Sequence, residues 1–90
     1  MQQRALVRLV NARGLHARPC HAIASIALRF KSTLRIAHGG SSVDAKSILD
    51  LLTLCAAPGA ELELIAEGDD AAEMLRCVVE LVAQRFGETD

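Results

Sequence analysis

The sequence predicts an α+β fold in which a four-stranded antiparallel sheet carries three helices on one face. Segment 61–67 alternates, with Leu62, Leu64 and Ala66 on one side and mainly Glu on the other, as in a strand with one buried face. Segment 71–86 repeats its apolar residues at helical spacing instead. Strand-like and helix-like segments follow one another in the order β-α-β-β-α-β-α. Taken alone, this order also fits a ferredoxin-like domain with an added helix.

Three further strands are expected in the first half of the chain. In residues 5–10, Ala5, Val7 and Leu9 share one face. Residues 33–37 alternate in the same way, and a short strand is expected around 41–43. Gly39 and Gly40 lie between these two segments and tolerate positive φ at both central positions of a turn. The two segments are therefore predicted to form a hairpin.

The helices are predicted from their apolar spacing and their end signals. The first is expected from about residue 17 to 29 or 30. The second begins near Ser47, whose spacing to Asp50 is a capping-box variant, and is ended by Pro58 and Gly59. The third follows the turn 68–70. The expected buried positions are Ile23, Ile26, Ala27 and Phe30 in the first helix, with Ala22 at the margin, and Ala71, Leu75, Val78, Val79, Val82 and Phe86 in the third.

Length and composition restrict the class of protein. Ninety residues with 51% hydrophobic content predict one domain over residues 1–90. A formal net charge of −1 argues against a general nucleic-acid binder. No apolar run approaches the ~20 residues of a membrane span, and the N-terminus leads into a strand rather than a signal peptide. Three widely spaced cysteines are typical of reduced thiols. We therefore expect a cytoplasmic monomer without nucleic-acid or membrane partners.

The candidate reactive residue is His16, at the junction between the first strand and the first helix. Pro19 fits a helix start, because its missing N–H is tolerated only there. A helix start offers unpaired amides and the positive end of the dipole, and both favour an anion. The amides of Ala17, Arg18 and Cys20 are the expected donors to a phosphoryl group, and the Arg18 side chain adds positive charge. The alternative is a histidine that serves only as a turn or cap residue.

Two motifs resemble one known family. The segment Gly14-Leu15-His16-Ala17-Arg18-Pro19, followed by Lys46-Ser47-Ile48-Leu49, closely resembles the HPr phosphocarriers of the bacterial phosphotransferase system. The resemblance covers the chain from Val7 to about Phe86. It implies an open-faced two-layer β-sandwich with sheet order 1-4-2-3. Segments 51–54 and 56–59 also resemble the nitrogen-related paralogue NPr.

The resemblance further implies a function and its partners. Enzyme I, itself phosphorylated by phosphoenolpyruvate, would phosphorylate His16 at Nδ1, with Arg18 as the electrostatic partner of the phosphoryl group. His16 would then pass the group to a histidine of an acceptor protein. Such a carrier is a relay rather than an enzyme, and it needs no cofactor.

Ser47 is a second candidate site. As a helix N-cap its hydroxyl would accept a backbone hydrogen bond, which is a sufficient structural explanation. In HPr relatives the matching serine is a regulatory site for a dedicated kinase, and a phosphate there would add about 1.5–2 negative charges beside the docking surface. The resemblance thus adds a serine kinase or phosphorylase to the expected partners.

Ile48, Leu49 and Leu52 are predicted to form an exposed docking patch, because the second helix carries more apolar side chains than one stripe can bury. The resemblance places Leu51 and Leu54 inside. The alternative is that all of these residues enter the core. Cys20 and His21 could join His16 in a metal site, but no fourth ligand stands at a suitable spacing and we expect no metal.

Two other functions compete with the relay. A regulatory adaptor of the same fold would use phosphorylation at His16 or Ser47 to control partner binding, and would form stable complexes without onward transfer. A ferredoxin-like ligand sensor would have a deep pocket or form a dimer, and His16 would have no role.

Overall fold

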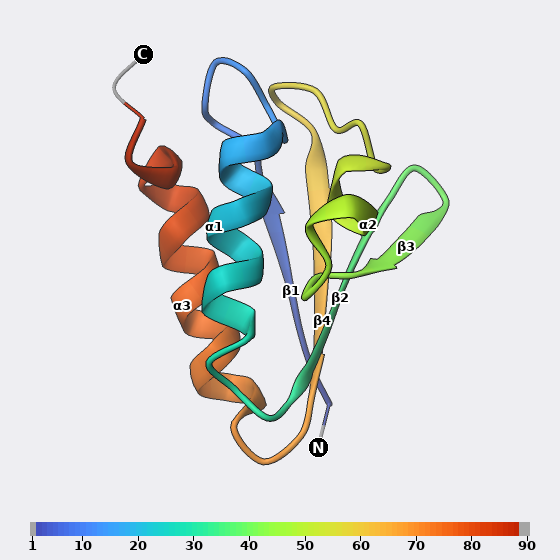
Figure 1. Cartoon of the computed structure of the whole chain (residues 1–90), viewed down its shortest axis with the longest axis vertical. Coiled ribbons are helices and arrows are strands. Elements are labelled where there is room, and N and C mark those ends of the chain that lie inside the picture. The colour runs from blue at the N-terminus through green and yellow to red at the C-terminus, as the bar shows by residue number, and fades with distance from the viewer. Residues whose placement is uncertain (1, 89–90) are drawn as a thin grey trace.

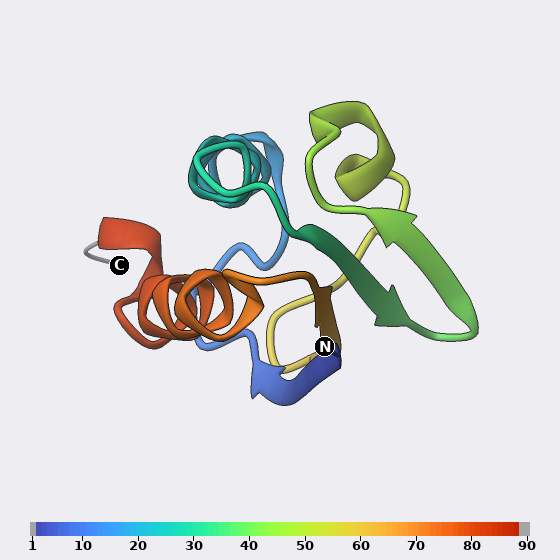
Figure 2. The ribbon, with the colours of Figure 1, turned by 90° about the horizontal axis from the view of Figure 1, so that it is seen from below.

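The computed structural model describes residues 2–88 and has the predicted architecture. Four antiparallel strands lie in the order β1-β4-β2-β3. The helices cover one face of this sheet and leave the other open (Figures 1 and 2). The open-faced two-layer sandwich is therefore confirmed, and the ferredoxin-like alternative is wrong. The elements are β1 (Gln2–Arg8), α1 (Ala17–Ala27), β2 (Thr33–His38), β3 (Ser41–Asp44), α2 (Ile48–Leu52), β4 (Glu61–Glu67), α3 (Ala71–Ala83) and the 3₁₀ turn η1 (Arg85–Gly87).

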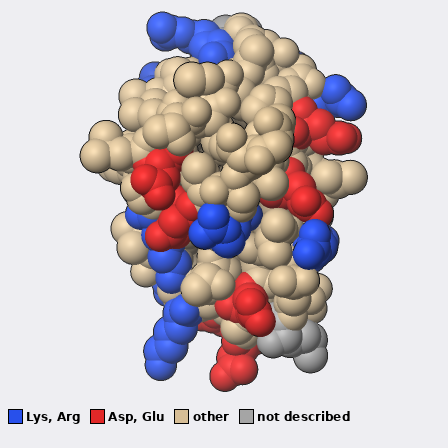
Figure 3. Space-filling view, turned by 90° about the vertical axis from the view of Figure 1, so that its right-hand side faces the viewer, with Lys and Arg blue, Asp and Glu red and all other residues tan. Residues whose placement is uncertain are grey.

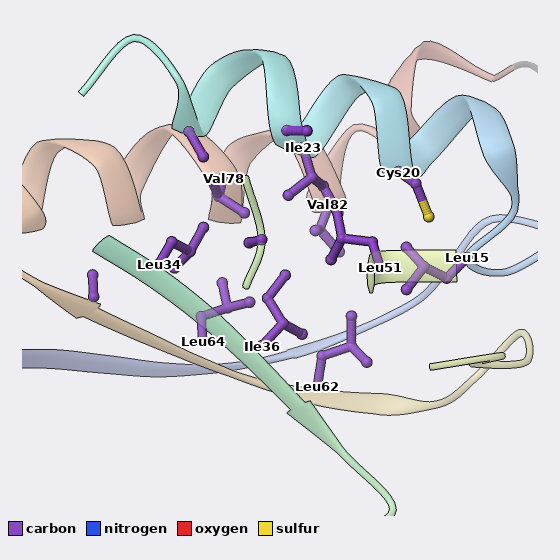
Figure 4. Close-up of a cluster of buried hydrophobic side chains, with 14 of the residues drawn as sticks. Leu15, Cys20, Ile23, Leu34, Ile36, Leu51, Leu62, Leu64, Val78 and Val82 are labelled. Carbon is purple, nitrogen blue, oxygen red and sulfur yellow. The ribbon is translucent and has the colours of Figure 1, made fainter. Parts of the chain in front are cut away.

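The strand register aligns the apolar faces that the alternation predicted. Leu64 of β4 lies opposite Ala5 of β1 on one side and Ile36 of β2 on the other. The side chains on this face point toward α1 and α3 (Figure 4). Burying each large apolar side chain contributes roughly 1.5–3 kcal/mol. The labelled core residues of Figure 4 are Leu15, Cys20, Ile23, Leu34, Ile36, Leu51, Leu62, Leu64, Val78 and Val82, all of them buried.

The β2–β3 hairpin is confirmed, and its turn has the expected backbone. Gly39 and Gly40 have φ of 58° and 86°, which is the left-handed region that a two-residue hairpin turn requires at both positions.

All three helices end earlier than the sequence predicted. α1 ends at Ala27 because the amides of Arg29 and Phe30 bond back three residues, to the carbonyls of Ile26 and Ala27. α2 ends at Leu52, six residues before Pro58, and Cys55 then takes a φ of 50°. α3 ends at Ala83, so the predicted continuation to Phe86 is wrong.

The predicted buried positions are confirmed with small changes. Ile26, Phe30, Val79 and Phe86 are only half-buried against the core. Met74 of α3 is fully buried, although it was not among the predicted core positions. A long unbranched side chain of this kind fills irregular gaps in a core.

None of the helices within residues 2–88 is long and apolar enough to cross a membrane.

Asp70 ties two turns together at the end of the sheet where β4 leads into α3. Its carboxylate accepts hydrogen bonds from the backbone amides of Lys31 and Ser32, at 3.0 and 2.9 Å, and from the Ser32 hydroxyl. The bond from the Ser32 side chain, followed by that from the Lys31 amide, lowers the pKa of Asp70 to about 2. Asp70 is the N-cap residue of α3, but its side chain does not cap the helix.

Candidate functional site

The loop that carries His16 is fixed by backbone contacts with the segment that follows α2. Gly14 has a φ of 66°, and a Cβ there would lie 2.6 Å from the Ala56 carbonyl oxygen. The Leu15 amide donates to that same oxygen at 3.0 Å, and the Leu15 side chain is buried. Glycine is thus required at position 14 both by its conformation and by the close approach of a second backbone. These contacts place His16 on a rigid support.

His16 lies directly before the first helix, as the sequence predicted, and is the N-cap residue of α1. Its backbone is extended, with φ of −103° and ψ of −170°, and its side chain makes no capping hydrogen bond. The imidazole is 26% exposed. Among the residues that the structure describes, no acceptor takes a hydrogen bond from the amide of Ala17 or Arg18. Two N–H groups at the positive end of the helix therefore remain open to an anion.

Cys20 does not belong to the expected set of amide donors. Its N–H donates to the His16 carbonyl oxygen at 3.1 Å and forms the first hydrogen bond of the helix. The prediction for this amide was wrong because Cys20 lies four residues after the N-cap, where the helical ladder already begins.

Arg18 adds an exposed cation beside the start of α1. The residue is exposed, and the structure records no ion pair or hydrogen bond of its guanidinium with any residue from 2 to 88. Pro19 beside it is buried, which anchors the first turn while leaving the Arg18 side chain in solvent. A guanidinium in this position can reach an anion bound at the helix start and bond to it through two N–H groups.

Two residues that the sequence did not mark as functional contact this site. Glu88 Oε2 lies 2.7 Å from His16 Nε2, and the Glu88 side chain is only 9% exposed. The buried Asn11 Nδ2 donates to Glu88 Oε1 at 3.1 Å and to the Gly14 carbonyl oxygen at 2.7 Å. Asn11 lies in the loop between β1 and α1, and Glu88 follows the turn η1. No spacing rule connects residues this far apart.

Cys20 and His21 show no arrangement typical of a metal site. The Cys20 thiol is fully buried, and burial raises its pKa to about 11. His21 is exposed on the side of α1 facing solvent. Within residues 2–88, no three His, Cys, Asp or Glu side chains come together as metal ligands would.

Ser47 caps α2 as predicted, since its Oγ accepts the Asp50 amide at 3.2 Å. The apolar residues of α2 divide between surface and core. Leu51 is buried, whereas Leu49 is 76% exposed and Ile48 is 36% exposed. Leu52, predicted as part of the exposed patch, is instead half-buried against the core.

The exposed apolar surface of α2 lies in a weakly charged region. Figure 3 views the molecule from the side of α2 and β3, and its upper part shows few charged groups near the centre. Acidic and basic side chains are mixed below it. Because α1 packs against α2, this surface belongs to the same part of the molecule as the His16 helix start.

Comparison with known proteins places these features in one family. A family model described as the PTS HPr component phosphorylation site matches residues 3–84. Phosphocarrier protein HPr of Neisseria meningitidis serogroup A is 38% identical over 82 residues, which make up 91% of this chain and 92% of that protein.

Solved structures agree with this match. HPr-C-His from Thermoanaerobacter tengcongensis has a TM-score of 0.93 at 33% identity, covering 98% of this chain and 99% of that one. An HPr dimer from the same organism has a TM-score of 0.77 at 35% identity, covering 91% and 94%. The similarity extends over the whole fold, including the start of α1.

Proposed function

The chain belongs to the HPr family of phosphocarrier proteins, and we propose that His16 accepts a phosphoryl group from phosphorylated Enzyme I and passes it to a histidine of an acceptor protein. The observation that carries this proposal is the position of the imidazole at the N-cap of α1, beside two amides without an acceptor among the described residues. These amides and the Arg18 guanidinium supply donors for the phosphoryl oxygens.

The transfer is a nucleophilic displacement at phosphorus. The lone pair of His16 Nδ1 forms the new N–P bond as the bond between phosphorus and the donor breaks, and the donor keeps that electron pair. On the way out, the N–P bond breaks, its electron pair returns to Nδ1, and the acceptor nitrogen takes the group. His16 is regenerated, so the protein acts as a relay within a transferase system without a cofactor of its own.

Partner docking is assigned to the α2 surface. Ile48 and Leu49 are exposed there, and Leu52 supports them from its half-buried position. Phosphorylation of Ser47 by a serine kinase would add about 1.5–2 negative charges next to this surface. It would also alter the Ser47 Oγ that accepts the hydrogen bond from the Asp50 amide. Ser47 is therefore the proposed regulatory site.

We extend the proposal to the setting of the protein. Residues 1–90 act as one carrier domain in the cytoplasm, where the three cysteines stay reduced, as they are in the structure. The working form is a monomer. Because a solved HPr from Thermoanaerobacter tengcongensis is described as a dimer, sedimentation at micromolar concentration is the measurement that checks the oligomeric state.

The direct test is phosphorylation in vitro. The protein is incubated with phosphoenolpyruvate and Enzyme I, and intact mass is measured before and after acid treatment. We expect one acid-labile phosphoryl group on the native chain, none on His16→Ala, and an unchanged result for His21→Ala, which alters an exposed histidine of the same helix. A labelled His16→Ala protein, or an unlabelled native protein, contradicts the proposal.

Onward transfer separates the relay from the regulatory adaptor. The phosphorylated protein is mixed with a histidine-containing acceptor of a phosphotransferase system. A relay loses its label to the acceptor, whereas an adaptor keeps the label and forms a stable complex.

A further inference from the structure

We propose that Glu88 is a positioning residue for phosphoryl transfer at His16: its carboxylate holds the Nε2 proton, so that Nδ1 presents the lone pair. This inference rests on the proposed function and deepens it. Glu88 lies beyond residue 84, where the family match ends. The contact joins residues that are 72 positions apart in the chain.

The contact fixes which ring nitrogen carries the proton. A neutral imidazole has one N–H and one lone pair, and an ionised carboxylate can only accept. Glu88 Oε2 lies 2.7 Å from His16 Nε2, so the hydrogen bond forms only when Nε2 is the donor. The remaining nitrogen, Nδ1, is then the nucleophile. The same logic applies wherever an acidic residue orients a catalytic histidine.

Asn11 holds the other oxygen of the same carboxylate. Its Nδ2 donates to Glu88 Oε1 at 3.1 Å and to the Gly14 carbonyl oxygen at 2.7 Å. Since both partners are acceptors, the orientation of the Asn11 amide is unambiguous. Asn11 is 1% exposed, so this clamp is part of the rigid loop that supports His16. The carboxylate is thus held at both oxygens, in the orientation that directs Oε2 at the imidazole.

The backbone after α3 is bent in a way that brings Glu88 to this place. Arg85 and Phe86 have φ of 57° and 56°, and Gly87 follows with 78°. Residues with a Cβ rarely adopt this region because the Cβ then lies too close to the following carbonyl oxygen. The half-buried Phe86 packs against the core, and the Glu88 amide donates to the Arg85 carbonyl oxygen at 2.9 Å. Figure 1 shows the resulting turn beside the first turn of α1. Strain of this kind is retained where it supports a function.

The carboxylate also matches the change in charge during transfer. When Nδ1 forms its bond to phosphorus, the Nε2 proton stays on the ring and the ring becomes cationic. Glu88 then faces the developing positive charge across a largely buried hydrogen bond, while the phosphoryl oxygens lie at the other nitrogen. When the N–P bond breaks, the ring returns to its neutral, Nε2-protonated form. No other proton has to move.

Glu88→Gln is the sharpest variant because a glutamine cannot satisfy both partners. If its oxygen accepts from His16, its NH₂ group faces the NH₂ group of Asn11. If it turns around to accept from Asn11, its NH₂ group donates to Nε2 and places the ring proton on Nδ1. Glu67→Gln is the matched control, with the same loss of charge on an exposed residue at the end of β4. Glu88→Asp keeps a carboxylate and serves as the conservative variant.

Two measurements are made on each protein. Nitrogen-15 NMR of the His16 ring, on protein without Enzyme I, reports which nitrogen carries the proton. The native chain and Glu67→Gln should hold the Nε2-protonated tautomer, and Glu88→Gln should gain the Nδ1-protonated one. The rate of phosphorylation by Enzyme I should fall about 10- to 100-fold in Glu88→Gln and less in Glu88→Asp.

The inference requires both changes. It is overturned if Glu88→Gln keeps the native tautomer, or if its rate equals that of Glu67→Gln. These outcomes are distinct from failure of the proposed function, in which the native chain itself takes no label and the tautomer measurement is unaffected.

Discussion

Two carboxylates, at opposite ends of the helical layer, bind partners in a similar way but have different consequences for the protein. Asp70 lies in the turn between β4 and α3, and Glu88 contacts His16 just before α1; Figure 1 shows this turn and the start of α1 at opposite ends of the helices. Each uses both oxygens and joins segments that are far apart in the chain. Asp70 binds residues 38 and 39 positions away. Glu88 binds residues 72 and 77 positions away.

The difference lies in the donors. Asp70 accepts hydrogen bonds from two backbone amides and one hydroxyl. These donors neither titrate near neutral pH nor react. Glu88 accepts hydrogen bonds from an imidazole and from a side-chain amide, and this imidazole is the proposed acceptor of the phosphoryl group. A carboxylate bound to backbone amides therefore only stabilises the fold, whereas one bound to a histidine also sets the chemistry of that ring.

The largest effects are expected from substitution of a glycine near each carboxylate, Gly14 near Glu88 and Gly68 near Asp70. A Cβ at Gly14 would lie 2.6 Å from the Ala56 carbonyl oxygen, and one at Gly68, with φ of 139°, would overlap the Ser32 side chain. Gly14→Ala and Gly68→Ala should each lower the free energy of unfolding by about 2–4 kcal/mol. Only Gly14→Ala should also slow phosphorylation of the folded protein, because only that glycine supports His16.

Urea unfolding combined with labelling by Enzyme I checks this pair. Gly40→Ala is the control, since a Cβ there meets nothing within 4 Å and only the positive φ is penalised, by about 1–2 kcal/mol. If folded Gly14→Ala is phosphorylated at the native rate, Gly14 does not support His16 and the predicted difference between Gly14 and Gly68 is wrong.

Arg18→Ala should act on the His16 end alone. The residue is exposed and its guanidinium forms no hydrogen bond or ion pair with residues 2–88, so the free energy of unfolding should not change. Loss of a charged hydrogen bond to the phosphoryl group, worth about 1.5–3 kcal/mol, should slow transfer roughly 10- to 100-fold. Single-turnover labelling measures the rate, and Arg29→Ala, beyond the other end of α1, is the control. Equal rates for the two variants would exclude Arg18 from the phosphoryl site.

Ser47→Ala tests a side-chain cap at the start of α2. Ser47 Oγ accepts the Asp50 amide, whereas the Asp70 side chain makes no capping bond to α3. The variant should lower the free energy of unfolding by about 1 kcal/mol without changing phosphorylation of His16. Ser41→Ala, on an exposed strand residue, should leave the stability unchanged. A Ser47→Ala protein of native stability would show that the α2 cap does not contribute.

The smallest expected effect is the pH dependence of the Asp70 contacts, because the carboxylate lies near solvent. Its pKa is lowered from 3.8 to about 2, so the contribution is fully present above about pH 4 and is lost as the pH falls toward 2. Thermal unfolding of the native chain and Asp70→Asn should therefore differ at pH 7 and converge near pH 2. Asp69→Asn is the neighbouring control, and a difference that persists at pH 2 would contradict the assignment.

Residues that act through local patterns were predicted well. The alternation of Leu62, Leu64 and Ala66 gave the buried face of β4, and the position of Pro19 gave the start of α1. Ser47 was recognised as a cap from its spacing to Asp50. Each of these signals depends on neighbours within four residues. The ends of the helices were predicted less well, because positive φ at Cys55 and Phe86 follows from packing and has no marker comparable to glycine.

The sequence by itself determined the order of the elements, the inward face of each strand and the placement of His16 at a helix start, because periodicity and capping are properties of short segments. Only the tertiary structure decided that Glu88 and Asn11 meet at the His16 ring and that Asp70 binds Ser32. Those contacts depend on how distant turns are brought together by packing of the helices on the sheet. A polar residue in a turn carries no local sign of which partner that packing will supply.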